Sequence, residues 1–159
     1  MYRIGSGWDR HRFAPGRKFV LGGVEFSEAE QGLLGHSDAD ALSHAICDAI
    51  LGAAALGDIG QHFPDTDPRW KGADSLLFLR EARRLVADQG YLVANVDATV
   101  ICEQPRIGPR SLEMRAALAG ALEISVDQVS VKATRGEGAG PEGRGECLTV
   151  QAVALLEKK

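Results

Sequence analysis

The sequence lacks the features that mark secreted and membrane-spanning proteins. Its three cysteines, Cys47, Cys102 and Cys147, are far apart and form no C-x-x-C pair, which indicates buried thiols in a reducing compartment. No apolar run approaches the ~20 residues of a membrane span, and the N-terminus has no apolar signal-peptide core. We therefore expect a cytoplasmic protein that uses neither disulfides nor a membrane.

Basic residues are also too few for a general attraction to polyanions. Lys and Arg number 18 against 22 Asp and Glu, a net charge of -4, so we expect neither nucleic acid nor membrane as a partner. An anionic substrate would need a local site made of metal, helix N-termini or a few cations. Glycine is the residue in excess, 19 of 159, which indicates close backbone approaches and special turns.

Hydrophobic periodicity predicts one α+β domain over residues 1–159. We expect a mixed β-sheet with helices packed on one face, and the last two strands as an antiparallel pair. Loops are predicted over 58–70 and 136–145. The predicted helices cover 38–56 (capped by Gly57), a segment that starts near Asp74 or Ser75 as N-cap and runs to Gly90, and about 111–122. The predicted strands cover 2–9, 19–21, 24–26, 91–102, 129–134 and 147–156.

The last predicted strand is apolar at nearly every position from Val150 to Leu156. A strand that is apolar on both faces is normally covered on both faces. Nothing else in the chain is left to cover the second face, so we expect a homo-oligomer.

Aspartate and histidine gather in residues 9–44, which hold three of the four histidines. Asp9 and His11 are two apart and point to one face if their strand extends that far. Asp40 and His44 share a face of the first helix. A set of Asp9, His11 and His44 leaves a fourth position open, as a catalytic zinc site requires. The alternatives are a surface turn for Asp9 and His11 and a hydrogen-bonded core histidine for His44.

Three further segments suit a phosphorylated substrate. His36-Ser37 precedes a helix N-terminus, whose free N–H groups bind phosphate. The strand ending in Lys132 to Arg135 leads into a glycine-rich loop that can wrap phosphate, although a flexible hairpin connection is the alternative. The acidic loops 57–60 and 63–68 can hold substrate hydroxyls or are plain turns.

Taken in order, these segments resemble the 2-C-methyl-D-erythritol 2,4-cyclodiphosphate synthase family of the non-mevalonate isoprenoid pathway. The resemblance implies a chorismate-mutase-like homotrimer with active sites between subunits. It also implies conversion of 4-diphosphocytidyl-2-C-methyl-D-erythritol 2-phosphate to the cyclic diphosphate and CMP. The matching segments span nearly the whole chain: Asp9/His11, 34–38 through His44, 51–60, 63–68, 71–75, 131–134 and 143–146.

The resemblance also implies roles for individual residues. Asp9, His11 and His44 would hold zinc, and Glu137 would hold a second divalent ion, magnesium or manganese. Arg144 and Glu146 match residues near the trimer axis, where an isoprenoid diphosphate could bind. The implied catalytic residues are His36, Thr134 and Arg135. The implied substrate-binding residues are Asp9, His11, His36, Ser37, Asp58, Ile59, Gly60, Phe63, Asp65, Asp67, Cys102, Pro105, Arg106, Ile107, Gly108, Ala133, Thr134, Arg135, Gly136, Glu137, Pro141 and Arg144.

Three positions depart from the family pattern. Arg135 aligns with the threonine that steadies the transferring phosphate, unless Thr134 takes that role after a one-residue shift. Arg106 replaces a lysine and Pro141 replaces an aromatic residue. Two other functions stay open at this point: a zinc-dependent phosphohydrolase, in which metal-bound water attacks, and a non-catalytic oligomer that binds isoprenoid phosphates.

Overall fold

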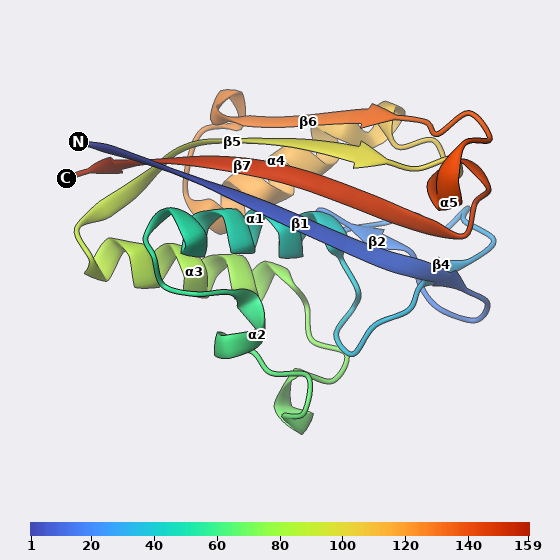
Figure 1. Cartoon of the computed structure of the whole chain (residues 1–159), viewed down its shortest axis with the longest axis horizontal. Coiled ribbons are helices and arrows are strands. Elements are labelled where there is room, and N and C mark those ends of the chain that lie inside the picture. The colour runs from blue at the N-terminus through green and yellow to red at the C-terminus, as the bar shows by residue number, and fades with distance from the viewer.

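The architecture is a five-stranded mixed sheet with helices packed against one face (Figure 1). A computed structural model describes all residues, 1–159. The strand order is β4-β1-β7-β5-β6, and β2 and β3 form a separate hairpin. The strands are β1 (Tyr2–Ala14), β2 (Val20–Leu21), β3 (Val24–Glu25), β4 (Gly32–Leu33), β5 (Tyr91–Ile101), β6 (Val129–Thr134) and β7 (Cys147–Lys158). The predicted α+β class is confirmed.

Three long helices cover the sheet, namely α1 (Ala41–Ala53), α3 (Leu76–Asp88) and α4 (Ser111–Leu122). Two further helices have one turn each, α2 (Ile59–His62) and α5 (Gly140–Gly143), and three 3-10 turns span 68–70, 108–110 and 126–128. Helix α1 lies at the centre of the hydrophobic core, and its residues Leu42, Ile46 and Ile50 are fully buried. It lies close to β1 because β1 carries glycines. A Cβ on Gly5 would lie 2.1 Å from the Ala49 carbonyl oxygen.

The opposite face of the sheet carries exposed apolar side chains. β1 and β7 pair antiparallel, with Ile4 opposite Leu155 and Trp8 opposite Gln151. Since strand residues alternate between faces, Ile4 and Trp8 point away from the helix that Gly5 and Gly7 contact. Ile4, Trp8 and Val153 are 72%, 52% and 41% exposed. In the single chain, therefore, this face is only partly covered.

The predicted antiparallel pair of the last two strands is wrong. β5 lies between β6 and β7, parallel to β6 and antiparallel to β7. The reason is the crossover through α4, which returns the chain to the start of β5 and makes the next strand parallel. Residues 135–146 then carry the chain past the end of β5 to β7, so they are not a hairpin connection.

Two predicted loops contain helical turns, and one predicted cap is wrong. Residues 58–70 hold α2, where the Asp58 side chain accepts the Gln61 N–H, and residues 136–145 hold α5. One-turn helices are too short to show a hydrophobic period. Gly57 does not cap α1. The helix ends at Ala53, and Ala55 takes the left-handed conformation with φ 58°.

All three cysteines are free and buried. None of the helices combines the length and apolarity that crossing a membrane demands. The two ends of the chain lie side by side (Figure 1), where the Lys158 N–H donates to the Met1 carbonyl at 3.0 Å.

Candidate functional site

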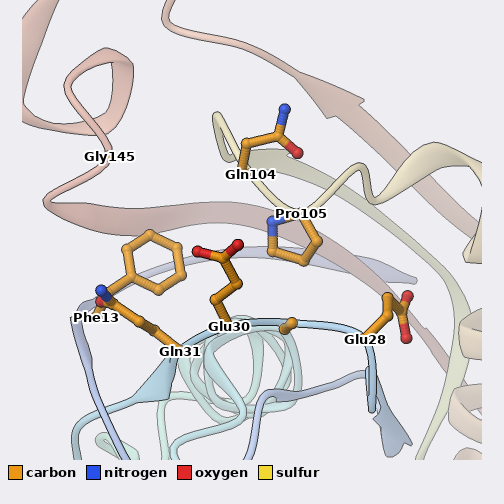
Figure 2. Close-up of a pocket in the computed structure, with 8 residues that line it drawn as sticks. Phe13, Glu28, Glu30, Gln31, Gln104, Pro105 and Gly145 are labelled. Atoms are coloured by element: carbon orange, nitrogen blue, oxygen red, sulfur yellow. The ribbon is translucent and has the colours of Figure 1, made fainter.

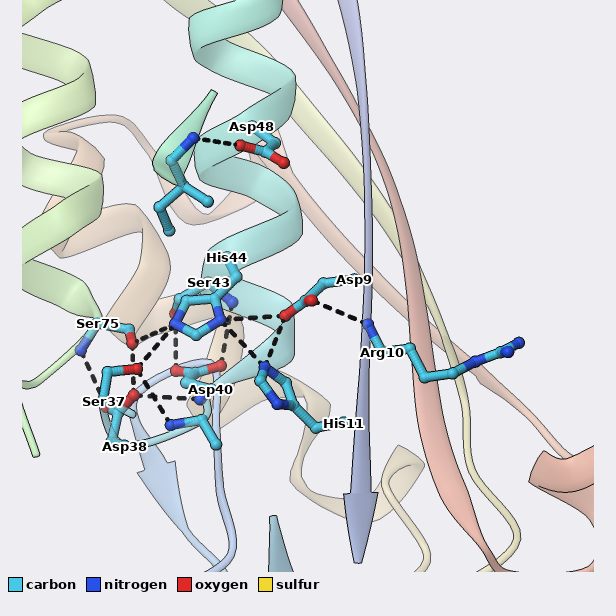
Figure 3. A network of polar contacts seen from close by, with 12 residues as sticks. Asp9, Arg10, His11, Ser37, Asp38, Asp40, Ser43, His44, Asp48 and Ser75 are labelled. Carbon is cyan, nitrogen blue, oxygen red and sulfur yellow. Dashed lines mark hydrogen bonds and ion pairs between the residues drawn. The ribbon is translucent and has the colours of Figure 1, made fainter. Parts of the chain in front are cut away.

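Three side chains from β1 and α1 converge at one point (Figure 3). The Asp9 Oδ2 lies 2.9 Å from the His11 Nε2 and 3.0 Å from the His44 Nδ1. The two ring nitrogens are 3.3 Å apart. The spacing of these three residues in the sequence predicted this cluster. The expectation that Asp9 and His11 share a strand face is confirmed.

Local structure explains how each ring is placed. β1 extends to Ala14, so Asp9 and His11 stand on the face toward α1. The His11 Nδ1 donates to the Leu34 carbonyl at 2.7 Å, which leaves its Nε2 free to face the site. His44 lies one turn inside α1.

Asp40 does not join this group, although its spacing from His44 predicts a shared helix face. Its carboxylate is fully buried and accepts the N–H groups of Gly22 at 2.8 Å and Ser43 at 3.0 Å. It also accepts the Gly23 N–H at 2.8 Å. Asp40 is therefore the N-cap of α1 and anchors the β2–β3 turn.

The charges of the three side chains stabilise one another. Burial opposes ionisation of Asp9, but hydrogen bonds from His11 and His44 hold the pKa of Asp9 well below its usual value. Burial also disfavours the charged His11 ring, yet the hydrogen bond and charge of Asp9 outweigh it and raise the pKa of His11. A carboxylate that stays ionised beside two imidazoles is a donor set for a cation.

The donor set fits a zinc ion. One carboxylate oxygen and two imidazole nitrogens lie within 4.8 Å of one another. Nitrogen and oxygen donors of this kind suit zinc, and catalytic zinc sites commonly use three protein ligands. The side chains are 26%, 17% and 12% exposed for Asp9, His11 and His44, so the cluster is sheltered but open to a ligand.

The resemblance places His36, Ser37 and the Asp58–Gly60 turn at the erythritol-phosphate end of the substrate, and Ser37 contacts the cluster directly. The Ser37 Oγ is 3.2 Å from the His44 Nε2. The His36 Nε2 donates to the Asp67 carbonyl at 3.2 Å, which ties the two loops together. Phe63 stacks on Phe78 at 4.5 Å between ring centroids, and Phe78 lies 6.0 Å from the His44 ring.

The turn made by Asp58, Ile59 and Gly60 is held to α1 by Asp48, a residue that sequence reasoning did not single out. The Ile59 N–H donates to the Asp48 carboxylate at 2.7 Å (Figure 3). Burial raises the pKa of Asp48, and its hydrogen bond to Ile59 only partly offsets this. Asp65 is exposed in the loop that follows.

A second group forms around a cavity of about 200 Å³ at the ends of β5 and β6. Seven of the predicted substrate-binding residues line it, namely Cys102, Arg106, Ile107, Gly108, Ala133, Thr134 and Arg135. Glu103, which falls within the stretch Cys102 to Gly108 that the resemblance assigns to the cytidine and its phosphates, also lines it and pairs with the Arg135 Nη2 at 2.5 Å. The same carboxylate accepts the Glu137 N–H at 3.0 Å. Burial raises the pKa of Cys102 to about 12, so that thiol is neutral.

The remaining predicted residues lie elsewhere. Pro105 lines a different and larger cavity of about 390 Å³, beside Phe13 and Glu30 (Figure 2). Pro141 belongs to α5. Arg144 is exposed and pairs with Glu146 at 2.6 Å. Gly136 lies in tight backbone contact with Gly143, and the Glu137 side chain is exposed and does not join the triad.

Two contacts near the triad were missed because single residues carry no periodic signal. Asp48 falls on the face of α1 that bears His44. Ser75 and Asp38 lie in the segments that carried the resemblance, but Ser75 was expected only as a candidate helix N-cap and Asp38 had no assigned role. Only their position in the sequence, next to predicted site residues or on the same helix face, could have pointed to these residues.

Comparison with protein families gives one match that spans the chain. The family model described as the YgbB family matches residues 2–157. The 2-C-methyl-D-erythritol 2,4-cyclodiphosphate synthase of Solibacter usitatus is 58% identical over 156 residues, which cover 98% of each chain. The bifunctional enzyme IspD/IspF of Anaeromyxobacter dehalogenans is 62% identical over 152 residues. The match covers 96% of this chain but spans only 39% of that relative's length.

Solved structures share the fold over the whole chain. The bifunctional IspDF from Campylobacter jejuni has a TM-score of 0.95 at 36% identity, covering 100% of this chain and 43% of that one. The CDP complex of IspF from Plasmodium falciparum has a TM-score of 0.87 at 34% identity, covering 99% of this chain and 97% of that one.

Proposed function

The chain belongs to the YgbB family, as its motifs predict, and from that premise we propose that it is a 2-C-methyl-D-erythritol 2,4-cyclodiphosphate synthase. In the proposed reaction the 2-phosphate of the diphosphocytidyl substrate attacks the β-phosphorus of the same molecule. A phosphorus–oxygen bond forms there, the bond to the bridging oxygen breaks, and CMP leaves. The protein supplies no nucleophile, so its task is to position the substrate and to neutralise charge.

The observation that carries this proposal is the convergence of Asp9, His11 and His44 on one point. A zinc ion held by these three residues would supply positive charge for the phosphate oxygens. One metal ion at this site would also allow a chain of net charge -4 to bind a phosphorylated substrate. We propose magnesium or manganese as a second ion at Glu137, two residues after Arg135 of the cavity at the ends of β5 and β6.

The chain's own residues divide between the two ends of the substrate. We assign His36, Ser37 and the Asp58–Gly60 turn to the erythritol-phosphate end. Ser37 contacts His44, and the turn is bonded to Asp48, four residues after His44 on α1. Phe63, Asp65 and Asp67 complete that loop. The cavity beside Arg135 is assigned to the cytidine and its phosphates. The CDP complex of the Plasmodium relative supports a nucleotide site in this fold. Arg135 is an always-charged phosphate ligand, while Thr134 offers a hydroxyl, and either can steady the transferring phosphate.

The triad and the nucleotide cavity share no lining residue within one chain. We therefore propose that the active site is completed between subunits of a homotrimer. The exposed Ile4, Trp8 and Val153 on the outer face of the sheet support an interface there, because a contiguous apolar patch on a free surface is unfavourable. We also propose that an isoprenoid diphosphate binds at the trimer axis near Arg144. We further propose that the protein is cytoplasmic.

Product analysis tests the reaction. Purified protein is incubated with the cytidyl substrate and magnesium, and the products are identified by mass. Cyclic diphosphate with CMP is the expected result. Linear products that have gained water would instead support the phosphohydrolase, and binding without turnover would support a non-catalytic role.

The assembly is tested separately by light scattering of the purified protein. A mass three times that of the 159-residue chain is expected. Trp8→Glu places a charge on the proposed interface and should release monomers. Leu112→Glu is the matched control, because Leu112 is 65% exposed but lies on α4, away from that face. A parent protein that stays monomeric at high concentration contradicts the trimer.

A further inference from the structure

The two rings of the triad are oriented by different kinds of partner. His11 uses a backbone carbonyl, that of Leu34, for the nitrogen that faces away from the site. The corresponding nitrogen of His44, Nε2, faces a hydroxyl instead, the Ser75 Oγ at 2.8 Å (Figure 3). A carbonyl can only accept a hydrogen bond, whereas a hydroxyl can either donate or accept. The Ser75 hydroxyl alone therefore does not decide which nitrogen of His44 carries the proton.

Asp38 removes this ambiguity. Its Oδ1 lies within hydrogen-bond distance of the Ser75 Oγ, and its Oδ2 accepts the Ser75 N–H at 2.9 Å. An ionised carboxylate only accepts, so the Ser75 proton must point to Asp38. The lone pairs of the Ser75 oxygen are then left for the His44 Nε2–H. In the neutral ring, which is the form that ligates a metal, this direction of donation leaves the His44 Nδ1 unprotonated, facing Asp9 and His11.

The placement of Ser75 indicates that its hydroxyl is reserved for this contact. Ser75 is the N-cap residue of α3, yet its side chain makes no capping hydrogen bond. A serine at this position normally accepts an N–H of the first helical turn. Here Asp74 accepts the Leu76 N–H at 2.9 Å instead. Ser75 is fully buried, so water does not compete for the hydroxyl.

A second hydroxyl near the same nitrogen is a weaker candidate. The Ser37 Oγ lies 3.2 Å from the His44 Nε2, and it also receives the Ala39 N–H at 3.3 Å. No carboxylate contacts it, so nothing fixes the direction of its proton.

We infer that Asp38 and Ser75 form a positioning pair for the metal site, which holds His44 in the tautomer that ligates through Nδ1. The inference rests on the zinc site proposed above. Neither residue touches the triad's ligating atoms, so both act through His44. Hydrogen-bond partners of this kind commonly change metal affinity by about 10–100-fold when they are removed.

Zinc affinity measured without substrate tests the pair. A chromophoric chelator competes for zinc with the parent protein, Ser75→Ala and Asp38→Asn. Both variants should bind zinc about 10–100-fold more weakly. Asp74→Ala is the matched control, because it removes the adjacent helix cap and leaves the pair intact; its zinc affinity should equal that of the parent. Since no substrate is present, the result does not depend on whether the protein proves to be a cyclising enzyme.

A spectroscopic measurement separates positioning from a loss of packing. In the zinc-loaded protein with isotope-labelled histidine, the His44 Nε2–H should give a proton signal protected from exchange with water. Ser75→Ala should lose that protection while the thermal unfolding of α1 and α3 stays cooperative. Unchanged zinc affinity in Ser75→Ala, or an equal loss in Asp74→Ala, overturns the inference. If Ser75→Ala does not fold, an unprotected His44 Nε2–H in the parent protein overturns it equally.

Discussion

Gly7 of β1 lies directly against the carbonyl group of Ala45 in α1. A Cβ built on Gly7 would lie 1.8 Å from the Ala45 carbonyl oxygen, far inside any contact that real atoms make. Ala45 follows His44, and Gly7 precedes Asp9 by two residues. Because glycine has no side chain, position 7 allows the strand that carries Asp9 and His11 to lie close to the helix that carries His44.

Gly7→Ala should push α1 away from β1 and separate the triad. We expect the free energy of unfolding to fall by about 3 kcal/mol, as overpacking in a dense core does, and zinc binding to be lost. Chemical denaturation and metal analysis measure the two effects. Gly120→Ala is the control, because Gly120 lies in α4 with nothing within 4 Å of an added Cβ. That change should stabilise the protein by about 0.5–1 kcal/mol. A Gly7→Ala protein of parental stability would contradict the close packing.

Zinc content follows from the triad. Purified protein should contain about one zinc per chain, and Asp9→Ala or His11→Ala should remove it, because three protein ligands are needed to hold the ion. Elemental analysis of dialysed samples measures this. His62→Ala should keep its zinc, since His62 donates to the Leu56 carbonyl and lies outside the triad. Full turnover by zinc-free protein would refute the role of the site.

The metal-free protein should show a pH dependence that Asp9 and His11 produce together. The pKa of Asp9 is lowered from 3.8, so its stabilisation is present above that pH and is lost as pH falls through the folded value. The pKa of His11 is raised from 6.5, so its stabilisation is complete below that pH and is lost as pH rises through the folded value. Both contributions to stability are therefore present together between pH 3.8 and pH 6.5.

Urea unfolding of the parent and of Asp9→Asn, both treated with chelator, checks this window. The stability difference between them should be largest near about pH 5 and smaller near about pH 3 and pH 9. A difference that does not vary with pH would mean that the pair contributes no charge-dependent stability.

Asp48 should stabilise the turn at residues 58–60 by accepting a hydrogen bond, and its negative charge should not be needed. Asp48→Asn keeps an oxygen for the Ile59 N–H and removes a carboxylate whose pKa burial raises, so stability at neutral pH should equal or exceed that of the parent. Asp48→Ala leaves the N–H unpaired and should cost about 1 kcal/mol, with a higher KM because the turn loses its anchor. Equal KM values for the two variants would show that the turn needs no anchor.

Glu137→Gln tests the separation of the two proposed ions. The substitution removes one negative charge at constant size, so more magnesium should be required for half-maximal activity, while zinc content stays at the parental value. A magnesium titration together with zinc analysis gives both results. Loss of zinc in this variant would mean that the two ions share one site.

The sequence predicted the elements whose pattern is local. The helix at 111–122 and the strand at 129–134 have the predicted bounds, and Asp9 and His11 share a face because strand alternation depends on spacing alone. The position of β5 between β6 and β7 was not predictable in this way, since strand order depends on the path of the α4 crossover and on tertiary packing.

Side-chain partners were the least predictable part of the site. Asp40 has the spacing of a fellow ligand of His44, yet its carboxylate is used by the N–H groups of Gly22, Gly23 and Ser43. Ser75 looked like a simple helix cap, but its hydroxyl contacts His44. In both cases the fold chooses between a local partner and a distant one. Gly22 and Gly23 lie 18 and 17 positions from Asp40, and Ser75 lies 31 positions from His44.

The meeting of the two chain ends has a consequence for protein engineering. Lys158 bonds to Met1 at one end of β1, whereas Asp9 and His11 occupy the half of that strand that leads to β4. At roughly 3.3 Å per residue, the strand from Met1 to Asp9 places the triad about 26 Å from this corner. A short peptide linking residue 159 to residue 1, with new ends opened in an exposed loop, should give a circular permutant whose metal chemistry is intact. In the unpermuted chain, a cargo attached at residue 1 or residue 159 would lie clear of the reacting groups.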